Sequence, residues 1–244
     1  MCTLTWLTKP DGYQIFFNRD ELITRQQAQS PLIHTYNGVK VICPIDPDHG
    51  GTWITVNQYA LSLALLNKYE DEKSVQPDLW KSRGILVSEL SSLPNQVAVV
   101  EALNAADLFA IKAFDLIIFE PRKLPVQMTW NGTELIRTVG PKMPLTSSSF
   151  DTLNVISSRK KYFEESMSAG DISEQLLISF HNSHSPKRGP YSVCMHRDDG
   201  YTVSFSRIDA DSNKVSFAYK NGPLCETRGM QQLSMQATKH SNEI

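Results

Sequence analysis

The chain has 244 residues, which is enough for one large domain or two small ones. Its hydrophobic content of 41% and charged content of 20% are ordinary for a globular protein. A formal net charge of -2, without a run of Lys and Arg, argues against nucleic acid as a partner. The sequence lacks a stretch of roughly 20 apolar residues and a secretory leader pattern, so we expect no transmembrane segment and a cytoplasmic location.

Two strand-like segments flank a turn near the start of the chain. Residues 3–7 and 13–17 are rich in β-branched and aromatic side chains, and the Pro-Asp-Gly sequence at 10–12 is typical of a turn. A hairpin centred on this turn places Cys2 beside Arg19 or Asp20. A guanidinium beside a thiol favours the thiolate, and a carboxylate can hold an amine.

Cys2 directly follows the initiator Met1. A small second residue permits removal of the methionine, and Cys2 then carries both a thiol and a free α-amine. The thiolate is a nucleophile, and an α-amine with a pKa of roughly 7.7–8.0 can act as its base. We therefore predict that Cys2 is catalytic and that Arg19 and Asp20 set its charge state. The alternative is a buried structural cysteine beside an ordinary Arg-Asp pair.

Three parts of the sequence together resemble a known family. Cys2, the Asn-Arg-Asp-Glu sequence at 18–21, and residues 50–57 followed by Leu-Leu-Asn at 65–67 are similar to the NRDE proteins, also called the transport and Golgi organisation family. The resemblance is looser over residues 145–207. It implies an N-terminal nucleophile hydrolase fold: an α+β, four-layer αββα sandwich of two antiparallel sheets between helical layers. It also implies a distant similarity to the choloylglycine hydrolases, which cleave amide bonds of conjugated bile acids and penicillins.

Strand and helix patterns alternate along the rest of the chain. A polar loop is expected over residues 21–30, and strands over 39–43, 52–57, 60–67, 114–119, 126–130, 134–137, 191–196, 201–207 and 214–219. Helices are expected over residues 78–90, 94–104, 152–169 and 173–182. Asp151 is the expected cap of the third helix, and Asp171 or Ser173 that of the fourth. This order predicts one α+β domain over residues 1–225 and a polar, frayed C-terminal tail over residues 226–244.

Three further residues are candidates for the site. Asn67 ends a predicted buried strand, and the resemblance to choloylglycine hydrolases implies that it is the oxyanion residue; the alternative is a strand-end Asn that caps a turn. Asn57, at a hairpin corner, has the stronger structural explanation. Ser147 stands where the family usually has an Asn that touches the N-terminal amine or the substrate. Arg188 is the candidate for a late Arg that orients the active-site carboxylate in related hydrolases.

Several side chains offer metal ligands without forming a recognised pattern. Asp46 and Asp48 lie in a turn-rich loop that lacks the other ligands of a calcium site. A second group offers ligands for zinc or haem iron and consists of His181, His184, Cys194 and His196. Local roles at a helix end and in the core explain these residues better. We therefore predict no metal and no cofactor.

The leading hypothesis is a hydrolase with an N-terminal cysteine nucleophile, acting on a linear amide or a similar acyl bond. The alternative is a non-catalytic binding or carrier protein for a hydrophobic ligand such as haem or an acyl lipid, which the family's association with secretion, lipid and haem handling suggests. Ser147 favours the carrier, because serine lacks the amide of the usual Asn. The combination of Cys2, Arg19 and Asp20 favours the hydrolase.

Overall fold

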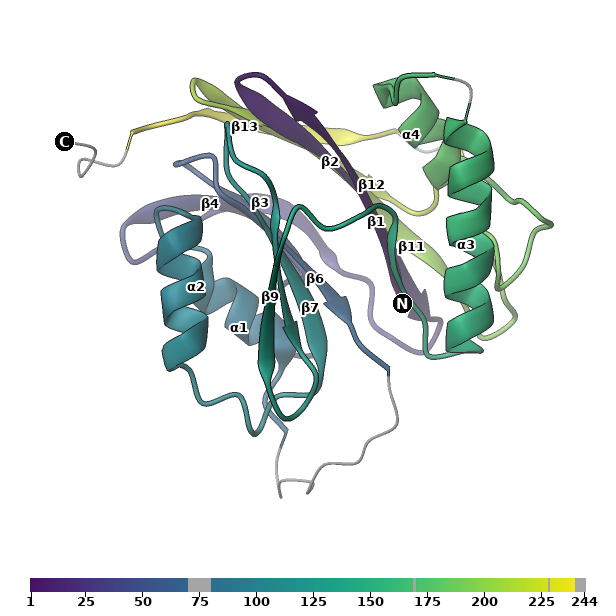
Figure 1. Cartoon of the computed structure of the whole chain (residues 1–244), viewed down its shortest axis with the longest axis horizontal. Helices are drawn as coiled ribbons and strands as arrows, with labels where there is room; N and C mark the ends of the chain where they lie inside the picture. Colours follow the sequence, from purple (N-terminus) through teal and green to yellow (C-terminus); the bar gives the residue numbers. More distant parts are fainter. Residues whose placement is uncertain (70–79, 169, 228, 240–244) are drawn as a thin grey trace.

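The computed structural model describes residues 1–69, 80–168, 170–227 and 229–239, which form thirteen strands and four helices (Figure 1). The strands make two antiparallel sheets that pack face to face. Two helices cover the outer face of each sheet. They are α1 (Arg83–Leu90) and α2 (Gln96–Ala105) on one side, and α3 (Thr152–Met167) and α4 (Glu174–Asn182) on the other. The predicted four-layer αββα sandwich is therefore confirmed.

The six-stranded sheet brings the beginning and the later part of the chain together. Its strands, in spatial order, are β10 (Leu145–Ser147), β1 (Cys2–Lys9), β2 (Gly12–Leu22), β11 (Gly200–Asp211), β12 (Lys214–Asn221) and β13 (Gln231–Gln236). The first hairpin lies between strands that follow it by more than a hundred residues. Residues near Cys2 are therefore surrounded by segments that are distant in sequence.

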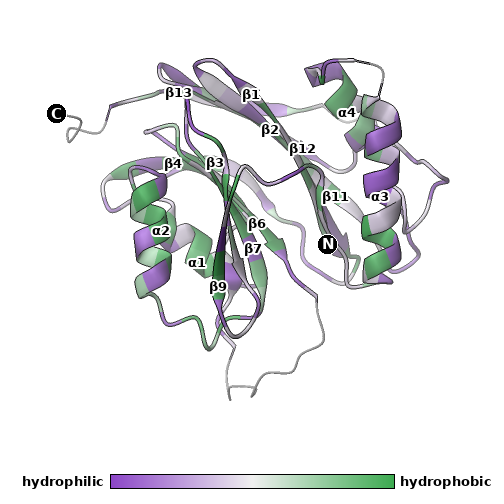
Figure 2. Cartoon of the chain, viewed as in Figure 1, coloured by the Kyte–Doolittle hydropathy of each residue, from purple (hydrophilic) through white to green (hydrophobic). Residues whose placement is uncertain are grey.

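The seven-stranded sheet follows the chain order. Its strands are β3 (Gln29–Tyr36), β4 (Val39–Ile45), β5 (Ile54–Asn57), β6 (Ser62–Asn67), β7 (Phe114–Phe119), β8 (Val126–Trp130) and β9 (Leu135–Val139). Alternate residues of β6 point to opposite faces, so Ala64 and Leu66 pack between the sheets while Leu63 and Leu65 pack against α1 and α2. This explains why β6 is apolar at nearly every position, as Figure 2 shows for the central strands.

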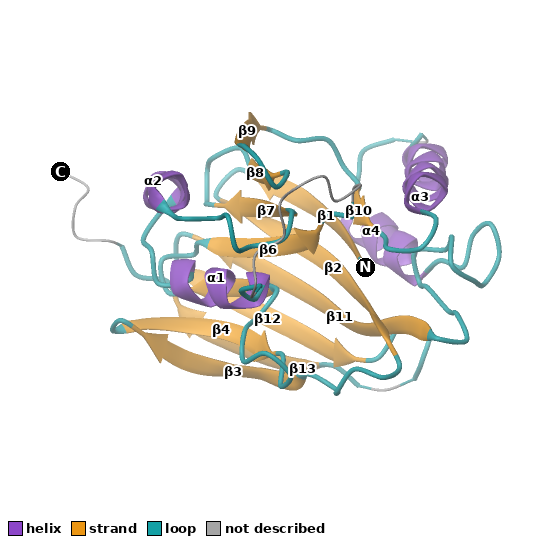
Figure 3. Ribbon diagram, turned by 90° about the horizontal axis from the view of Figure 1, so that it is seen from below, coloured by secondary structure: helices purple, strands orange, loops and turns teal. Residues whose placement is uncertain are grey.

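Three apolar cores lie between the four layers. Figure 3 shows the helices and strands of these layers from below. The core between the sheets contains Leu4, Trp6 and Phe17 from the first hairpin. On the outer face of the six-stranded sheet, Phe16 packs against α3 and α4 through side chains that include Phe180. Neighbouring residues of one strand therefore serve different cores, because strand side chains alternate. None of the described helices is long and apolar enough to cross a membrane.

Two of the four described helices, α2 and α4, begin at a side-chain cap. The Ser173 side chain accepts a hydrogen bond from the main-chain N–H of Leu176, which confirms it as the cap of α4. Asp151 precedes α3 as predicted, but among the described residues its carboxylate accepts hydrogen bonds from the side chains of Tyr191 and Asn154 and caps no main-chain N–H. The predicted start of the first helix at Asp78 lies outside the described residues.

Three predicted elements differ from the structure. The expected loop over 21–30 is shorter in the structure and covers residues 23–28, because β2 continues to Leu22 and β3 begins at Gln29. The expected strand over 191–196 is irregular, because side chains of Asn18, Ser192 and Thr202 bond its main chain. The expected frayed tail contains β13, an edge strand on β12. Its polar residues stay exposed while Leu233 and Met235, at alternate positions, pack against the core between the sheets.

Candidate active site

Three of the predicted site residues lie in one row across neighbouring strands. In the antiparallel pairing, Cys2 of β1 is opposite Arg19 of β2 on one side and Ser147 of β10 on the other. The predicted hairpin register is therefore confirmed. Residues directly opposite each other point to the same face of a sheet. This face is the one that packs toward the second sheet, because Cys2 belongs to the core between the sheets.

Met1 extends the pairing of β1 by one residue. Its amine donates to the main-chain oxygen of Asp20 at 2.9 Å, and the N–H of Asp20 donates to the oxygen of Met1 at 2.8 Å. Main-chain groups of successive strand residues point to opposite neighbours, so the main-chain nitrogen of Cys2 points toward β10. A free amine at Cys2 would consequently face Ser147, whose buried hydroxyl makes no hydrogen bond within the described part of the chain.

A cavity of about 350 Å³ opens beside Cys2, and we call it the cysteine cavity. Its lining comprises Cys2, Arg19, Glu21, Arg25, Asp46, His49, Gly51, Thr52, Trp53, Leu65, Asn67, Trp80, Lys81, Ser82, Arg83, Gly84 and Lys112. Asn67, at the end of β6, reaches this cavity from the facing sheet, as the predicted role requires. Its side-chain amide donates to the hydroxyl of Tyr69 at 3.2 Å.

Arg19 is nearly buried and held in place from several sides. Its guanidinium lies 3.4 Å from a carboxylate oxygen of Glu21 and 3.6 Å from one of Asp46, and it stacks 4.3 Å from the ring centroid of Trp53. Arg25 contributes a second cation that pairs with Asp46. The turn-rich loop after β4 thus holds Arg19 and Arg25 through its carboxylates.

The thiol of Cys2 is protonated at neutral pH while Met1 is in place. Burial raises the pKa of Cys2 to about 11, and the charges of Asp20 and Glu21 act in the same direction. The N-terminal amine and Arg19 lower the pKa, but less than burial raises it. The prediction that Arg19 favours the thiolate therefore has the correct direction, whereas desolvation decides the net state because a buried charge loses its hydration.

Asp20 points away from the cysteine cavity, toward the outer helical layer. Its carboxylate accepts a hydrogen bond from Arg159 of α3 at 3.1 Å and one from the hydroxyl of Thr202 at 2.7 Å. Arg159 also donates to the hydroxyl of Thr3 at 2.6 Å. Asp20 and Arg159 are both fully buried. The side chain of Asp20 therefore holds β1, β2, β11 and α3 together. Only the main chain of Asp20 contacts the start of the chain, at Met1.

Arg188 does not line the cysteine cavity. It donates to Nδ1 of His196 at 3.2 Å, on the outer side of the molecule. The carboxylate of Asp20 accepts from Arg159 and not from Arg188, so the role predicted for Arg188 stays a prediction without a contact behind it in the described residues. The signal for Arg159 was its spacing: Val155, Arg159 and Phe163 lie four residues apart on the buried face of α3, and an Arg on an apolar helical face needs a buried partner.

Asn18 and His181 complete the network on the outer face of β2. The amide of Asn18 donates to the main-chain oxygens of His181 at 2.9 Å and Val193 at 3.0 Å. Nε2 of His181 lies 2.9 Å from the hydroxyl of Thr5. Burial, followed by the charge of Arg159, lowers the pKa of His181 to about 3, so the ring is neutral at physiological pH. This histidine has the structural role that the local explanation predicted.

Asn57 also has the structural role expected of it. Its buried amide donates to the main-chain oxygens of Ser91 at 3.0 Å and Leu93 at 2.8 Å. Its side-chain oxygen accepts from the N–H groups of Tyr59 and Leu61, which closes the turn between β5 and β6. Of the two asparagines that were considered for oxyanion binding, Asn67 alone lines the cysteine cavity.

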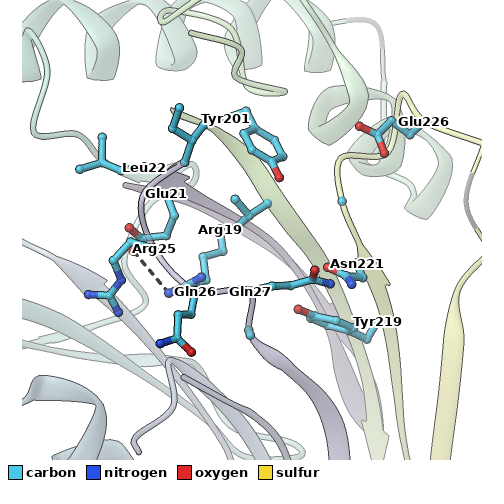
Figure 4. A pocket seen from close by; sticks show the side chains of 14 residues that line it. Arg19, Glu21, Leu22, Arg25, Gln26, Gln27, Tyr201, Tyr219, Asn221 and Glu226 are labelled. Carbon is cyan, nitrogen blue, oxygen red and sulfur yellow. Dashed lines mark ion pairs between the residues drawn. The ribbon is translucent and has the colours of Figure 1, made fainter. Parts of the chain in front are cut away.

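Arg19, Glu21 and Arg25 line both the cysteine cavity and a second, smaller one, whose lining Figure 4 shows. The second cavity has a volume of about 90 Å³, and we call it the tyrosine cavity. Its lining includes Arg19, Glu21, Tyr201, Tyr219 and Glu226. The dashed line in Figure 4 marks the ion pair of Arg19 with Glu21.

Two antiparallel sheets between helical layers, with a cysteine at the start of an inner strand, define the class of the N-terminal nucleophile hydrolase fold. Solved structures of this class are similar to the chain over nearly its whole length. The conjugated bile acid hydrolase of Clostridium perfringens, determined as a cysteine-to-alanine mutant, has a TM-score of 0.56 at 13% sequence identity, with 96% of this chain and 92% of that chain covered. The penicillin V acylase of Agrobacterium tumefaciens has a TM-score of 0.53 at 10% identity, with 91% and 84% covered.

A third structural relative is the Caenorhabditis elegans orthologue of N-acylethanolamine-hydrolyzing acid amidase. It has a TM-score of 0.53 at 12% identity, with 85% of this chain and 92% of that chain covered. Residues 1–198 match the family described as Transport and Golgi organisation 2, and the chain belongs to this family. A comparison with curated proteins finds no match. The family resemblance of the Cys2 and Asn-Arg-Asp-Glu sequences is therefore confirmed.

Proposed function

We propose that the protein is an amide hydrolase whose nucleophile is the thiol of Cys2 after removal of Met1. The observation that carries this proposal is the pair of Cys2 and Arg19, opposite each other on the inner face, which lines one cavity together with Asn67 of the facing sheet. Nucleophile, cation and amide donor reach one space from two different sheets. The likeness to bile acid hydrolase, penicillin V acylase and acid amidase supports the same reaction class.

The reaction begins with a proton transfer at Cys2. Its own amine accepts the thiol proton, and the thiolate attacks the carbonyl carbon of the amide. The C–N bond breaks, the amine product leaves with the proton, and the acyl group remains on sulfur as a thioester. Water then adds to the thioester, the C–S bond breaks, and the carboxylic acid leaves while the thiol is restored. Self-activation matters because burial otherwise keeps the pKa of Cys2 at about 11.

Asn67 and Ser147 complete the proposed machinery. The amide of Asn67 donates to the oxygen of the attacked carbonyl as negative charge develops there, which is the task of an oxyanion donor. Ser147 faces the freed amine and offers it a hydroxyl, which is shorter than the Asn that the family usually has there. Asp20 acts as a positioning residue, because it holds β1 and β2 in register through the buried pair with Arg159.

The charge of the cavity lining selects the substrate. Five basic side chains contribute to the described lining, namely Arg19, Arg25, Lys81, Arg83 and Lys112, against the two carboxylates of Glu21 and Asp46. The carboxylates pair with Arg19 and Arg25. Arg83 donates to the main-chain oxygen of Ala113, and Lys112 lies over the ring of Trp80, 5.1 Å from its centroid. We therefore propose an acyl amide that bears a carboxylate or another anionic group.

Paired substrates test both parts of the proposal. N-acylglycines and N-acylethanolamides of equal acyl length differ in one negative charge, and we expect turnover with a preference of about tenfold or more for the acylglycine. Cys2→Ala should abolish turnover, a loss of several orders of magnitude that corresponds to about 8 kcal/mol of transition-state stabilisation. Intact-mass measurement of the untagged protein should give a chain without Met1.

A matched pair of asparagine variants separates catalysis from stability. Asn67→Ala should lower kcat with little change in Tm, whereas Asn57→Ala should lower Tm because it leaves buried main-chain groups without partners. A chain that retains Met1, or a wild type that cleaves neither substrate while it binds haem or an acyl lipid saturably, would overturn the hydrolase and support the carrier. Turnover equal in wild type and Cys2→Ala would assign the activity to a contaminant or to a site elsewhere on the chain.

A further inference from the structure

Four side chains that bind soft metal ions gather on the outer side of the six-stranded sheet, away from the cysteine cavity. They are His184, Cys194, His196 and Cys225, and one nitrogen or sulfur atom of each lies within 4.8 Å of the others. The sequence pattern suggested His181 for such a group, but His181 is buried beside Thr5 instead. Cys225 comes from a loop 29 residues after His196, so only the folded chain brings the four together.

The distances within the cluster match those of a tetrahedral zinc site. The sulfur of Cys194 lies 3.6 Å from the sulfur of Cys225 and 3.6 Å from Nε2 of His196, and the sulfur of Cys225 lies 3.4 Å from the same nitrogen. Zinc bonds of about 2.3 Å to sulfur and 2.0–2.1 Å to nitrogen, at tetrahedral angles, separate two sulfurs by about 3.8 Å and a sulfur and a nitrogen by about 3.6 Å. Both cysteines are free thiols.

His184 supplies the fourth position. Its ring lies 5.0 Å from the ring of His196, centroid to centroid, in an edge-on arrangement. Its Nε2 is buried and makes no hydrogen bond within the described residues. A buried ring nitrogen without a partner is unfavourable, and a metal ion beside it removes the penalty. Closing the tetrahedron requires His184, which lies in a loop, to move inward by about 1 Å.

The backbone around the cluster is held independently of any ion. The N–H of Cys194 donates to the oxygen of Ser183 at 2.9 Å, and the N–H of His196 donates to that of Gly189 at 3.3 Å. Lys220 donates to the main-chain oxygen of Glu226 at 2.8 Å, which fixes the loop that carries Cys225. The ligands are therefore presented by anchored segments from the end of α4, the irregular 191–199 segment and the loop after β12.

We propose that His184, Cys194, His196 and Cys225 bind one Zn²⁺ ion as a closed structural site. Four protein ligands with two thiolates and two neutral imidazoles complete the coordination, so no position is left for a substrate. Binding releases the two thiol protons. The ion would join the helical layer to the strands that position Asp20, because Thr202, which bonds the main chain of Met195, also donates to Asp20.

One contact must change when the ion binds. Arg188 donates to Nδ1 of His196, but a histidine that binds zinc through Nε2 carries its proton on Nδ1. The exposed guanidinium of Arg188 therefore has to turn into solvent. Arg188→Ala should therefore leave the affinity for zinc unchanged or raise it. A lower affinity for zinc in this variant would contradict the expected displacement of Arg188.

Metal analysis of the full chain, purified without a polyhistidine tag, tests the proposal. We expect about one zinc per wild-type chain and less than a tenth of that in Cys225→Ser, whose exposed position leaves folding intact. Cys2→Ala is the matched control: it removes a thiol from the other face of the sheet and should retain zinc while losing hydrolysis. Failure of the hydrolase proposal would therefore not affect this result.

Two further measurements decide the geometry and the role. Co²⁺ taken up in place of zinc should give the intense visible bands of a tetrahedral site with thiolate ligands, and Cys194→Ser should weaken them. A strong chelator should lower the Tm of the wild type by about 5 °C or more and leave Cys225→Ser unchanged. Purified protein with neither zinc nor stoichiometric Zn²⁺ uptake, or with a disulfide between Cys194 and Cys225, would overturn the proposal.

Discussion

Strand β2 presents Arg19 and Glu21 to the space between the sheets, and Asn18 and Asp20 to helices α3 and α4. The side chains on the outer face are held by protein partners at short distances: the Asn18 amide donates to two main-chain oxygens, and the Asp20 carboxylate accepts from Arg159 and Thr202. The inner face is different, because its side chains border two cavities and bind each other at longer distances. Four consecutive residues thus divide between a structural network and a candidate site.

This difference teaches how to interpret a short charged sequence in a strand. Alternation sends adjacent residues to opposite faces, so one sequence block can serve two purposes. Charges on a closed face stabilise the fold only as complete pairs, whereas charges beside a cavity remain available to a ligand. Variants of the two faces should therefore fail in different ways, and the following predictions test this from the largest effect to the smallest.

Arg159→Met should be the most destabilising change on the outer face. It leaves the fully buried carboxylate of Asp20 without its cation, and breaking such a pair costs about 3–5 kcal/mol. Urea unfolding measures the loss. The matched control is Arg207→Met, which removes a partly exposed pair with Glu174 on the same face and should cost less than about 1 kcal/mol. An equal loss of unfolding free energy in both variants would show that the buried pair contributes no more to stability than the partly exposed one.

Acid should weaken the outer network through His181. Its pKa of about 3 in the folded chain lies below the ordinary value of 6.5, so the unfolded chain binds a proton first and stability falls as the pH drops below about 6.5. We expect a loss of about 2 kcal/mol between pH 7 and pH 5. His181→Asn should flatten this part of the pH profile, since it removes the titrating ring. An unchanged slope in the variant would assign the acid sensitivity to other groups.

Arg19→Ala should have the smallest effect on the fold and a chemical effect on the inner face. The guanidinium lowers the pKa of Cys2, so its removal should slow alkylation of Cys2 by about threefold to tenfold near neutral pH. Mass spectrometry of the Cys2 peptide after iodoacetamide treatment gives the rate. Arg207→Ala, an outer-face cation, should leave the rate unchanged. A pH dependence that is the same in wild type and Arg19→Ala would show that the two residues are not coupled.

The amount that could be predicted differs between local and long-range features. The register of Cys2 and Arg19 followed from a single short turn, because a hairpin fixes pairing by counting residues from its centre. Asn67 was assigned to the site by resemblance to the choloylglycine hydrolases, and it lines the cysteine cavity. Arg188 was predicted to contact the carboxylate, whereas Arg159, which was not considered, makes the contact with Asp20. A guanidinium within a helix gives no sign of which buried carboxylate it meets 139 residues away.

The sequence by itself determined most of the strand and helix order, the four-layer architecture implied by the resemblance, and the pairing of Cys2 with Arg19. These depend on local periodicity, turn chemistry and short-range counting. Only the tertiary structure decided that Asp20 faces Arg159, that burial outweighs Arg19 in setting the pKa of Cys2, and that Cys225 joins three earlier residues in one cluster. Burial and long-range contact arise when distant segments pack together, so no local pattern records them.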